Sequence, residues 1–226
     1  MNANSKILYD GILFKLYKEL KADNIITVRG KKIVEELNFT ETFNSNTGII
    51  EINKIFKTSI NYIEHESHWY ESKNPNDAYI KEYAKIWEAT SDDRGMVNSN
   101  YGYLLYSPQN GYQYDNVLKE LKKDPHSRRA VAYYTNPFIH YTGGNDHICT
   151  AYVSYTIRNN RLIAIVSMRS NDIKFGLIGA DLEWQISIQK KLAKDLGVET
   201  GNMNWHCASA HIYERHFKHL IDLYEE

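Results

Sequence analysis

The chain has 226 residues, of which 42% are hydrophobic and 24% charged, a globular composition, and we expect residues 1–226 to form a single domain. Its 27 basic and 28 acidic residues leave a formal net charge of -1, which argues against direct nucleic-acid binding because such binding needs a basic surplus. With no apolar run near the roughly 18 residues of a membrane span, no secretory signal and only two cysteines, we expect a cytoplasmic protein without a membrane partner or a disulfide framework.

The first half of the chain has mostly helical patterns. Leu8, Ile12, Leu16 and Leu20 recur at a spacing of four, which predicts an amphipathic helix. Gly30 lies between short runs that alternate apolar residues with charges, which predict strands joined by a turn. In chain order, the patterns predict a helix over 8–20, strands within 24–43, helices over 58–72 and 77–89, an irregular segment over 91–110 and a helix over 114–123.

The second half is dominated by paired strands, above all a long hairpin over residues 149–170. A regular two-residue turn at Asn159-Asn160 would set the pairs Ile157–Leu162, Tyr155–Ala164, Val153–Val166, Ala151–Met168 and Cys149–Ser170. Further elements are expected as strands over 129–135 and 202–207 and helices over 181–196 and 211–224. Because helices alternate irregularly with paired strands, we predict a mixed α/β (α+β) fold rather than a doubly wound parallel sheet.

Cys149 is a candidate nucleophile at the end of a predicted strand. A free thiol has a pKa of about 8.5, so a nearby cation is needed to favour the thiolate. Arg169 is one such cation, but in the regular hairpin it points to the face opposite Cys149. A β-bulge near the strand end would be needed to bring the two together. The alternative is a buried cysteine that acts as a small hydrophobic residue.

Other residues could bind an anion or handle protons. Arg128-Arg129 follow a turn and Arg169-Ser170 end a strand, and guanidinium groups are suited to phosphate, although isolated arginines more often form surface salt bridges. Glu66, on a mostly apolar helix, could move protons or simply form a salt bridge. The histidines show no CxxC or HExxH pattern, so we expect no metal site.

Taken together, these motifs resemble the thymidylate synthase family. The motifs are DPHSRR at 124–129, Cys149, MRSND at 168–172 with Gly176, and HIY at 211–213. Four details are most similar to the phage deoxycytidylate hydroxymethylase branch: NSNYG at 98–102, Cys149-Thr150, Asn171, and YERHF at 213–217. The likeness runs from about Ile60 to Phe217, and it implies a large mixed sheet flanked by helices, with two subunits dimerising through the sheet.

The resemblance implies covalent catalysis on a pyrimidine deoxynucleoside monophosphate. Cys149 would add to carbon-6, and carbon-5 would then attack the methylene group of the cosubstrate 5,10-methylenetetrahydrofolate. A synthase reduces the resulting exocyclic methylene, whereas a hydroxymethylase adds water, and Glu66 would position that water and move protons. We expect hydroxymethylation of dCMP. The alternatives are hydroxymethylation of dUMP, thymidylate synthesis, or an inactive relative that binds nucleotide.

The resemblance also implies roles in binding. Arg169 and Ser170 would hold the 5′-phosphate together with Arg128 and Arg129, the last two reaching across the interface of a homodimer with shared active sites. His211 and Tyr213 would hold the sugar 3′-hydroxyl, Asn171 and Asp172 would contact substrate, and Trp87 and Tyr101 would line the folate and pyrimidine pocket by stacking.

Base choice depends on the residue that faces the ring nitrogen and the exocyclic group of the pyrimidine. Synthases use Asn there, and the cytidylate enzymes use Asp, whose carboxylate accepts from the cytosine amino group. Ungapped counting from Arg169 leads to Ala180, and one inserted loop residue leads to Asp181. We favour Asp181, because Ala180 would leave buried polar groups unpaired. Asp181 could also cap the helix that it opens.

Overall fold

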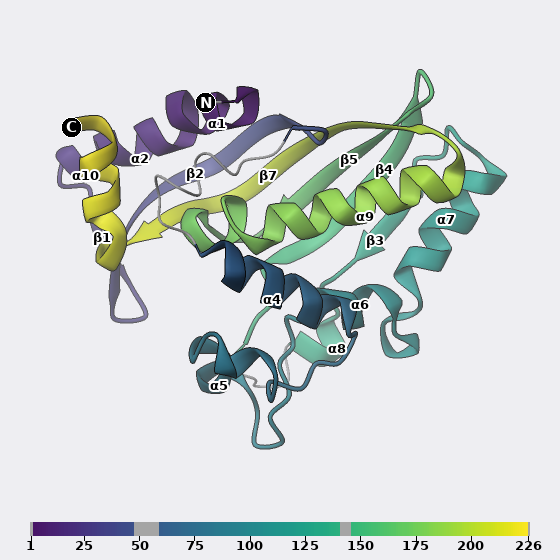
Figure 1. The fold of residues 1–226 in the computed structure, drawn as a ribbon, viewed down its shortest axis with the longest axis horizontal. Helices are drawn as coiled ribbons and strands as arrows, with labels where there is room; N and C mark the ends of the chain where they lie inside the picture. The colour runs from purple at the N-terminus through teal and green to yellow at the C-terminus, as the bar shows by residue number, and fades with distance from the viewer. Residues whose placement is uncertain (1, 48–58, 141–145, 226) are drawn as a thin grey trace.

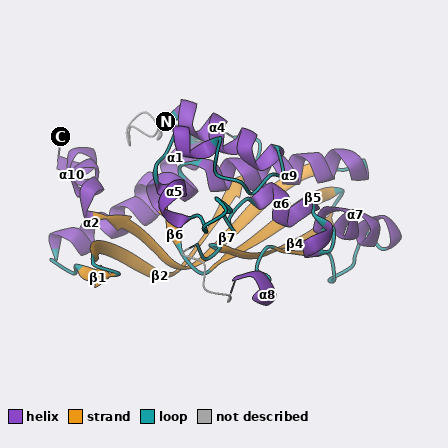
Figure 2. Cartoon of the chain, turned by 90° about the horizontal axis from the view of Figure 1, so that it is seen from below, coloured by secondary structure: helices purple, strands orange, loops and turns teal. Residues whose placement is uncertain are grey.

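The computed structural model describes residues 2–47, 59–140 and 146–225. A seven-stranded mixed sheet forms its centre, with the order β1-β2-β7-β5-β4-β3 and with β6 paired to β7 (Figure 1). The contacts of β7 with β5 and β6 are parallel, and its contact with β2 is antiparallel. Helices α4, α6 and α9 lie on one face of the sheet (Figure 2). The mixed fold with a large sheet flanked by helices is confirmed.

The strands are β1 (Ile26–Val28), β2 (Lys31–Asn44), β3 (Val131–Tyr133), β4 (Thr150–Arg158), β5 (Arg161–Met168), β6 (Asn171–Asp172) and β7 (Glu199–Tyr213). The α-helices are α1 (Ala3–Leu8), α2 (Phe14–Lys21), α4 (Ile60–Glu71), α5 (Ile86–Thr90), α6 (Tyr101–Tyr106), α7 (Gln113–Lys123), α8 (Pro137–His140), α9 (Ala180–Leu196) and α10 (Phe217–Glu225). Two π-helical turns, η1 (Tyr9–Leu13) and η4 (Ile173–Leu177), and three 3₁₀ turns, η2 (Ile80–Glu82), η3 (Pro108–Asn110) and η5 (Glu214–His216), complete the described elements. None of the helices in these ranges is long and apolar enough to cross a membrane.

Three of the predicted elements differ from the structure. The helix over 77–89 is interrupted, because Asp77 N donates to Gly95 O and Val97 N donates to Pro75 O, so tertiary hydrogen bonds replace helical ones. The segment over 91–110 contains α6, which Asn100 caps by accepting from Tyr103 N at 2.7 Å. The C-terminal helix begins at 217, because residues 211–213 extend β7 along β2.

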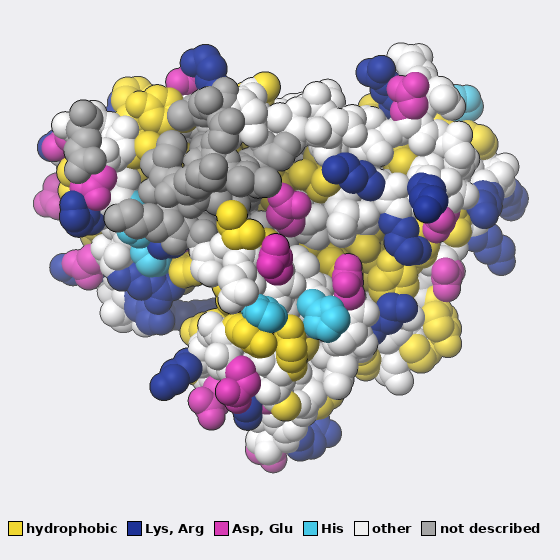
Figure 3. Space-filling view, in the orientation of Figure 1, with side chains coloured by type: hydrophobic (Ala, Val, Ile, Leu, Met, Phe, Trp, Pro, Cys, Tyr) yellow, Lys and Arg dark blue, Asp and Glu magenta, His cyan; other side chains and the backbone are white. Residues whose placement is uncertain are grey.

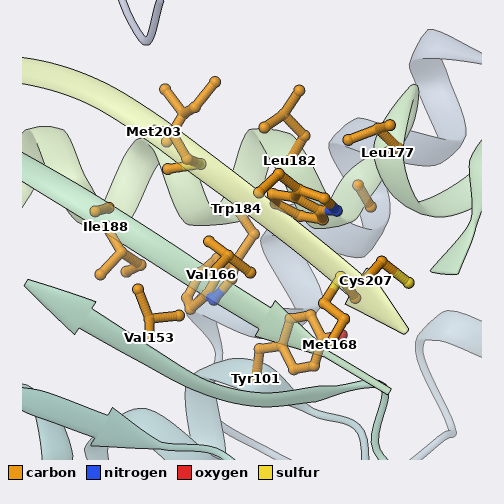
Figure 4. Packing of buried hydrophobic residues seen from close by; sticks show 14 of the residues in the cluster. Tyr101, Val153, Val166, Met168, Leu177, Leu182, Trp184, Ile188, Met203 and Cys207 are labelled. Carbon is orange, nitrogen blue, oxygen red and sulfur yellow. The ribbon is translucent and has the colours of Figure 1, made fainter. Parts of the chain in front are cut away.

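Helix α9 forms the centre of the hydrophobic core. Its side chains Leu182, Trp184 and Ile188 are buried and pack toward Val166 of β5 and Met203 of β7 (Figure 4). The helices α4 and α7 contact α9 as well. A helix covered by a sheet and by other helices needs apolar residues over most of its circumference, which explains its long run of buried positions.

The hairpin of β4 and β5 has the predicted turn and, over most of its length, the predicted register. Asn159 and Asn160 both have positive φ, as a two-residue hairpin turn requires, and Val153 pairs with Val166. At the open end the prediction is wrong by one residue, because Thr150 takes the place of Ala151 opposite Met168.

A β-bulge between Thr150 and Tyr152 causes this shift. The additional residue inverts the alternation of side chains in the rest of the strand. Thr150 is therefore directed into the core and is wholly buried. Cys149 follows on the other side, beside Arg169, whose backbone N–H donates to Cys149 O at 2.9 Å.

The neighbouring strands are irregular at the same level. Thr150, Met168, Cys207 and Phe39 form one buried row across β4, β5, β7 and β2. Immediately beyond this row, β5 ends, Asn38 of β2 has a φ of 55°, and the buried side of β7 changes from odd to even residues. The sheet therefore changes direction along a line that passes through Cys149 and Arg169.

Helices α4 and α6 meet at very short range at Gly102. A Cβ atom added to Gly102 would lie 1.6 Å from the backbone oxygen of Tyr70, which cannot move without distorting α4. We predict that Gly102→Ala lowers the free energy of unfolding by about 3 kcal/mol, at the upper end of overpacking costs. Urea unfolding of the variant and the wild type measures this, and equal stabilities would show that the two helices are not in such close contact.

Candidate active site

The bulge brings the Cys149 thiol to the guanidinium group of Arg169. Arg169 Nη2 lies 3.7 Å from Cys149 Sγ, and Arg169 Nε donates to Ile148 O at 2.9 Å. Burial raises the pKa of Cys149 to about 12, while the positive charge of Arg169 opposes this rise. The thiol is half-buried, whereas the other cysteine, Cys207, is wholly buried. The β-bulge thus brings Arg169 beside Cys149, which a regular hairpin would not do.

The residues that directly follow Arg169 in the chain contact several other residues of the candidate site. Ser170 Oγ lies 3.5 Å from Nδ1 of His211, whose ring is 5.1 Å from that of Tyr213. The Asp172 side chain accepts from Lys174 N at 2.9 Å and caps η4, and its contact with substrate stays a prediction. Burial raises the pKa of Asp172, and the charge of His211 opposes the rise.

Glu66 is the only one of the three glutamates of α4 that is buried. The other two are exposed on the outer face, where Figure 3 shows acidic side chains and histidines gathered over α4. Tyr70 OH donates to Glu66 Oε1 at 2.6 Å, and Tyr62 also hydrogen-bonds to the carboxylate. Burial raises the pKa of Glu66 to about 7 despite these donors. Glu66 is thus a buried carboxyl group that can both hold and release a proton near neutral pH.

Asp181 is a second such carboxyl group. Its Oδ2 accepts from Asn171 Nδ2 at 2.9 Å, and the nearby Tyr101 hydroxyl also lowers the pKa of this carboxyl. Burial raises the pKa of Asp181 to about 7, the two donors lower it, and the charge of Asp172 raises it. Asn171 is 1% exposed, and its Oδ1 has no partner in the described structure.

The π-helical turn η4 explains why Asp181 and not Ala180 lies here. A π turn accommodates one residue more than an α turn, which corresponds to the inserted loop residue of the sequence analysis. Ala180 is buried in the hydrophobic core. No side chain caps the start of α9, so the Asp181 carboxylate hydrogen-bonds to Asn171 and not to the helix end.

Gly176 leaves the space for the Asn171–Asp181 hydrogen bond. A Cβ atom at this position would lie 2.2 Å from Asn171 Nδ2 and 2.5 Å from Asp181 Oδ2. Any side chain there would separate the two polar groups.

An aromatic wall lies beside Glu66. Trp87 Nε1 donates to Tyr62 OH at 3.0 Å, and the rings of Tyr62 and Phe175 are 6.3 Å apart. Trp87 is half-buried and Phe175 is 37% exposed, so part of this wall is accessible to a ligand. Tyr101, in contrast, is 2% exposed. Because Tyr101 is buried, its ring offers no open face on which a ligand could stack. Its hydroxyl group instead accepts a hydrogen bond from Thr150.

The arginine pair is not near the site of its own chain. Arg129 is exposed and forms a salt bridge of 3.1 Å with Glu120. The carbonyl of Ala130 accepts from Tyr155 N, six positions along β4 from Cys149, which corresponds to roughly 20 Å. Arg128 is likewise exposed. These residues are therefore out of reach of the thiol of their own chain.

Two side chains to which the sequence analysis gave no role, Tyr62 and Tyr70, lie beside Glu66, and Thr150, named there only as part of a motif, contacts Tyr101. Tyr62 and Tyr70 flank Glu66 at spacings of four on α4, a signal that was available because such residues share a helix face. Thr150 donates to Tyr101 OH at 3.0 Å. Its orientation depends on the bulge, which no sequence pattern revealed. Among the described residues, no group of three or more His, Cys, Asp or Glu side chains could hold a metal ion.

A family model described as thymidylate synthase matches residues 20–225. The chain belongs to the thymidylate synthase family. It is 38% identical to the deoxycytidylate 5-hydroxymethyltransferase of Enterobacteria phage T4 over 176 residues, which are 71% of this chain and 70% of that protein. It is 30% identical to the deoxyuridylate hydroxymethyltransferase of Bacillus phage SP01 over 224 residues, 91% of this chain and 56% of that protein. The thymidylate synthase of Fusobacterium nucleatum is 27% identical over 158 residues, 68% of this chain and 56% of that protein.

Membership in the family establishes the general chemistry. The chain is a one-carbon transferase of the folate-dependent enzymes that modify carbon-5 of pyrimidine nucleotides, with methylenetetrahydrofolate as the family's cosubstrate. The residues present fit a flat, partly polar ring, because the half-buried Trp87 and the exposed edge of Phe175 lie beside the carboxyl of Glu66.

We predict that Arg169→Gln slows alkylation of Cys149. Loss of the positive charge at 3.7 Å removes the one cation among the described residues that favours the thiolate. The rate with iodoacetamide at pH 8 should fall about threefold to tenfold, which corresponds to half to one pKa unit. Cys149→Ser is the control, since the buried Cys207 should not react. An unchanged rate profile against pH would contradict the proposed electrostatic role.

We predict that Glu66→Gln stabilises the fold at alkaline pH. The folded-state pKa of about 7 exceeds the ordinary value of 4.5, so the wild type loses stability as pH rises from about 4.5 to 7. Gln cannot ionise, and the variant should be more stable than the wild type above pH 7, by at most about 3 kcal/mol, and equally stable below pH 4.5. Thermal unfolding across this range measures the difference. A variant that is less stable at every pH would contradict it.

Proposed function

We propose that the protein is a deoxycytidylate 5-hydroxymethyltransferase. It converts dCMP, 5,10-methylenetetrahydrofolate and water into 5-hydroxymethyl-dCMP and tetrahydrofolate. The observation that carries this proposal is the half-buried Asp181 carboxyl, which is hydrogen-bonded to Asn171 and whose charge raises the pKa of Cys149. The 38% identity to the phage T4 protein named for this reaction supports it.

Cys149 is the proposed nucleophile. Its thiolate, favoured by Arg169, adds to carbon-6 of the pyrimidine and makes carbon-5 electron-rich. When bound, the folate supplies a one-carbon unit at the oxidation level of formaldehyde. Arg169 and Ser170 bind the 5′-phosphate, and the neighbouring His211 and Tyr213 hold the sugar hydroxyl.

Glu66 is the proposed group that positions water and moves protons. A carboxyl with a pKa of about 7 is half-ionised near neutral pH, which suits a residue that must both accept and donate. Tyr62 and Tyr70 direct their hydroxyl groups at its oxygens and fix its orientation. Addition of water, with no hydride transfer, distinguishes this reaction from thymidylate synthesis.

Asp181 is the proposed base-selecting residue. Its carboxyl accepts from the amino group of cytosine and shares a proton with the ring nitrogen, whereas uracil presents a carbonyl and an N–H at these positions. Burial strengthens the selection, because a mismatched base leaves polar groups unpaired at roughly 1–3 kcal/mol each. The second candidate substrate is dUMP, favoured by the similarity over 91% of this chain to the phage SP01 deoxyuridylate enzyme.

We also propose a homodimer in which each site takes Arg128 and Arg129 from the other copy. Their distance from Cys149 within one chain requires a second copy if they are to contact the same phosphate. Ile165, Tyr133 and Tyr152 leave 40%, 55% and 39% of their surface exposed on the side of the sheet away from α9, and this face supports sheet-to-sheet contact.

The mass of the product tests the proposed reaction. Incubation with dCMP and methylenetetrahydrofolate should yield a nucleotide heavier by one CH₂O unit, without growth of dihydrofolate absorbance. Growth of that absorbance would identify a synthase, and product from dUMP alone would identify the second candidate. Cys149→Ser should yield no product.

We predict that Asp181→Asn shifts preference from dCMP toward dUMP. An amide both donates and accepts and therefore matches the carbonyl and N–H of uracil. The ratio of kcat/KM for dCMP to that for dUMP should fall by about 10-fold or more, the value of one lost buried hydrogen bond. Gly176→Ala, which displaces Asn171 and Asp181 without changing either, is a comparison that should lower activity on both. An unchanged ratio in Asp181→Asn would place base selection elsewhere.

We predict that inactive variants restore each other's activity when mixed. Cys149→Ser and the double variant Arg128→Ala/Arg129→Ala should each be inactive alone, but their heterodimer contains one complete site. Equal mixing should recover about a quarter of wild-type activity, since half of the dimers are mixed and each has one of its two sites intact. A mixture of Cys149→Ser with Arg169→Ala is the control and should recover none, because Arg169 serves the thiol of its own chain.

A further inference from the structure

Glu120 holds the side chain of Arg129 within its own chain. It lies on α7, which packs against the edge strand β3 (Figure 1). Arg129 Nε donates to Glu120 Oε1 at 3.1 Å, and Ser127 Oγ donates to the same oxygen at 2.6 Å. The backbone N–H of Arg129 in turn donates to Ser127 Oγ at 3.1 Å. The three residues thus form a closed ring of hydrogen bonds.

This ring differs from an ordinary surface ion pair. Ser127 is 4% exposed and Glu120 is half-buried, so Arg129 is the only member of the ring that is mostly exposed. The hydrogen bond from Ser127 and the charge of Arg129 lower the pKa of Glu120, which is therefore ionised at neutral pH. An exposed ion pair contributes little to stability. The main consequence of the ring is therefore the orientation of the Arg129 side chain.

The contact at Nε leaves the other edge of the guanidinium group available. This group presents its N–H donors in a rigid planar fork, so a hydrogen bond at Nε limits how the whole plane can turn. Neither Nη group of Arg129 hydrogen-bonds to a described residue, and 76% of the side chain is exposed. Arg128 is exposed as well, but no carboxylate of the described residues holds it. Only one arginine of the pair is therefore held in place.

We propose that Glu120 is a positioning residue that holds Arg129 ready for the 5′-phosphate of a nucleotide bound by the other copy. This inference rests on the proposed function, in which Arg128 and Arg129 cross the dimer interface, and it deepens that function by naming a residue that prepares one of them. The two Nη groups suit phosphate because they form a bidentate pair of donors. An arginine that is already held loses less rotamer freedom on binding, which favours affinity.

Removal of the Glu120 carboxylate has two opposite effects on a phosphate. The carboxylate repels the phosphate, so loss of its charge alone favours binding. Loss of its oxygen releases Arg129 and disfavours binding. Glu120→Gln removes the charge but keeps an oxygen that can accept from Arg129 and Ser127, whereas Glu120→Ala removes both. A comparison of the two variants therefore separates orientation from charge.

The test places each substitution in one chain of a mixed dimer. The dimer of Cys149→Ser with Arg128→Ala/Arg129→Ala has one complete site, whose arginines come from the Cys149→Ser chain. Glu120→Ala in that chain should raise KM for dCMP about fivefold and leave kcat within about twofold, because contacts with the phosphate bind substrate and transition state alike. Glu120→Ala in the other chain should not change KM, since that chain has no arginine to hold. Glu120→Gln in the first chain should give a KM no higher than that of the unsubstituted mixture.

Glu199→Ala is the matched control. Glu199 Oε2 accepts from Arg161 Nε at 3.1 Å, the same kind of contact at the same distance, at the opposite end of β5 from Arg169. This substitution should leave KM unchanged in either chain. Should Glu120→Ala not fold, Glu120→Leu repeats the test, because Leu favours the helix and also lacks an acceptor.

An unchanged KM with Glu120→Ala in the chain that supplies the arginines would overturn the inference. An equal rise from either chain would show a general structural role and would overturn it too, as would failure of Gln to restore the KM. The proposed function fails in a different way. Turnover of dUMP and not dCMP would contradict the proposed substrate alone, since both carry the same phosphate and the test then uses dUMP. An inactive unsubstituted mixture would overturn the shared site and this inference with it.

Discussion

The β-bulge at Ala151 is the constraint on which the site depends. One additional residue in β4 inverts the sides on which its last side chains lie, so that Thr150 enters the core and Cys149 meets Arg169. In a regular strand the thiol and the guanidinium would lie on opposite faces of the sheet. The strands on one side of β4, which are β5, β7 and β2, end or become irregular at the same level, so the bulge is part of a wider irregularity of the sheet.

Two desolvated carboxyl groups, the buried Glu66 and the half-buried Asp181, give the proposed site its proton chemistry at a cost in stability. Glu66 and Asp181 each have a pKa raised to about 7. The charge of Asp181 raises the pKa of Glu66, and the charge of Glu66 raises the pKa of Tyr101. Neutral residues in their places would be easier to bury. Hydroxyl donors limit this cost, and under the proposed function the two carboxyls suit a reaction that must remove a proton from carbon-5 and deliver water to the methylene group attached to that carbon.

The sequence was sufficient for the fold class, the family and the hairpin turn, because these follow from local patterns and from ordered motifs, and the set of site residues stays a prediction. It was not sufficient for the strand register at the site or for the orientation of the side chains there. The bulge is one additional residue in the β4–β5 pairing that no local pattern indicates, and the segment near Asp77 is held by a hydrogen bond from Asp77 N to Gly95 O. The position of Asp181 required knowledge of a π turn, which has no reliable pattern. The arginines near position 128 could be predicted as phosphate ligands, but only the structure shows that their own site is out of reach.

The central claim is that Cys149, activated beside Arg169, bonds to a pyrimidine ring. The most direct test is to incubate the protein with 5-fluoro-dCMP and methylenetetrahydrofolate and to map the modified peptide by mass spectrometry. Fluorine cannot leave carbon-5 as a proton does, so the covalent intermediate should accumulate. The account predicts one nucleotide per site on the peptide that contains Cys149. Turnover of dCMP without any such adduct, or an adduct on the Cys207 peptide, would contradict it.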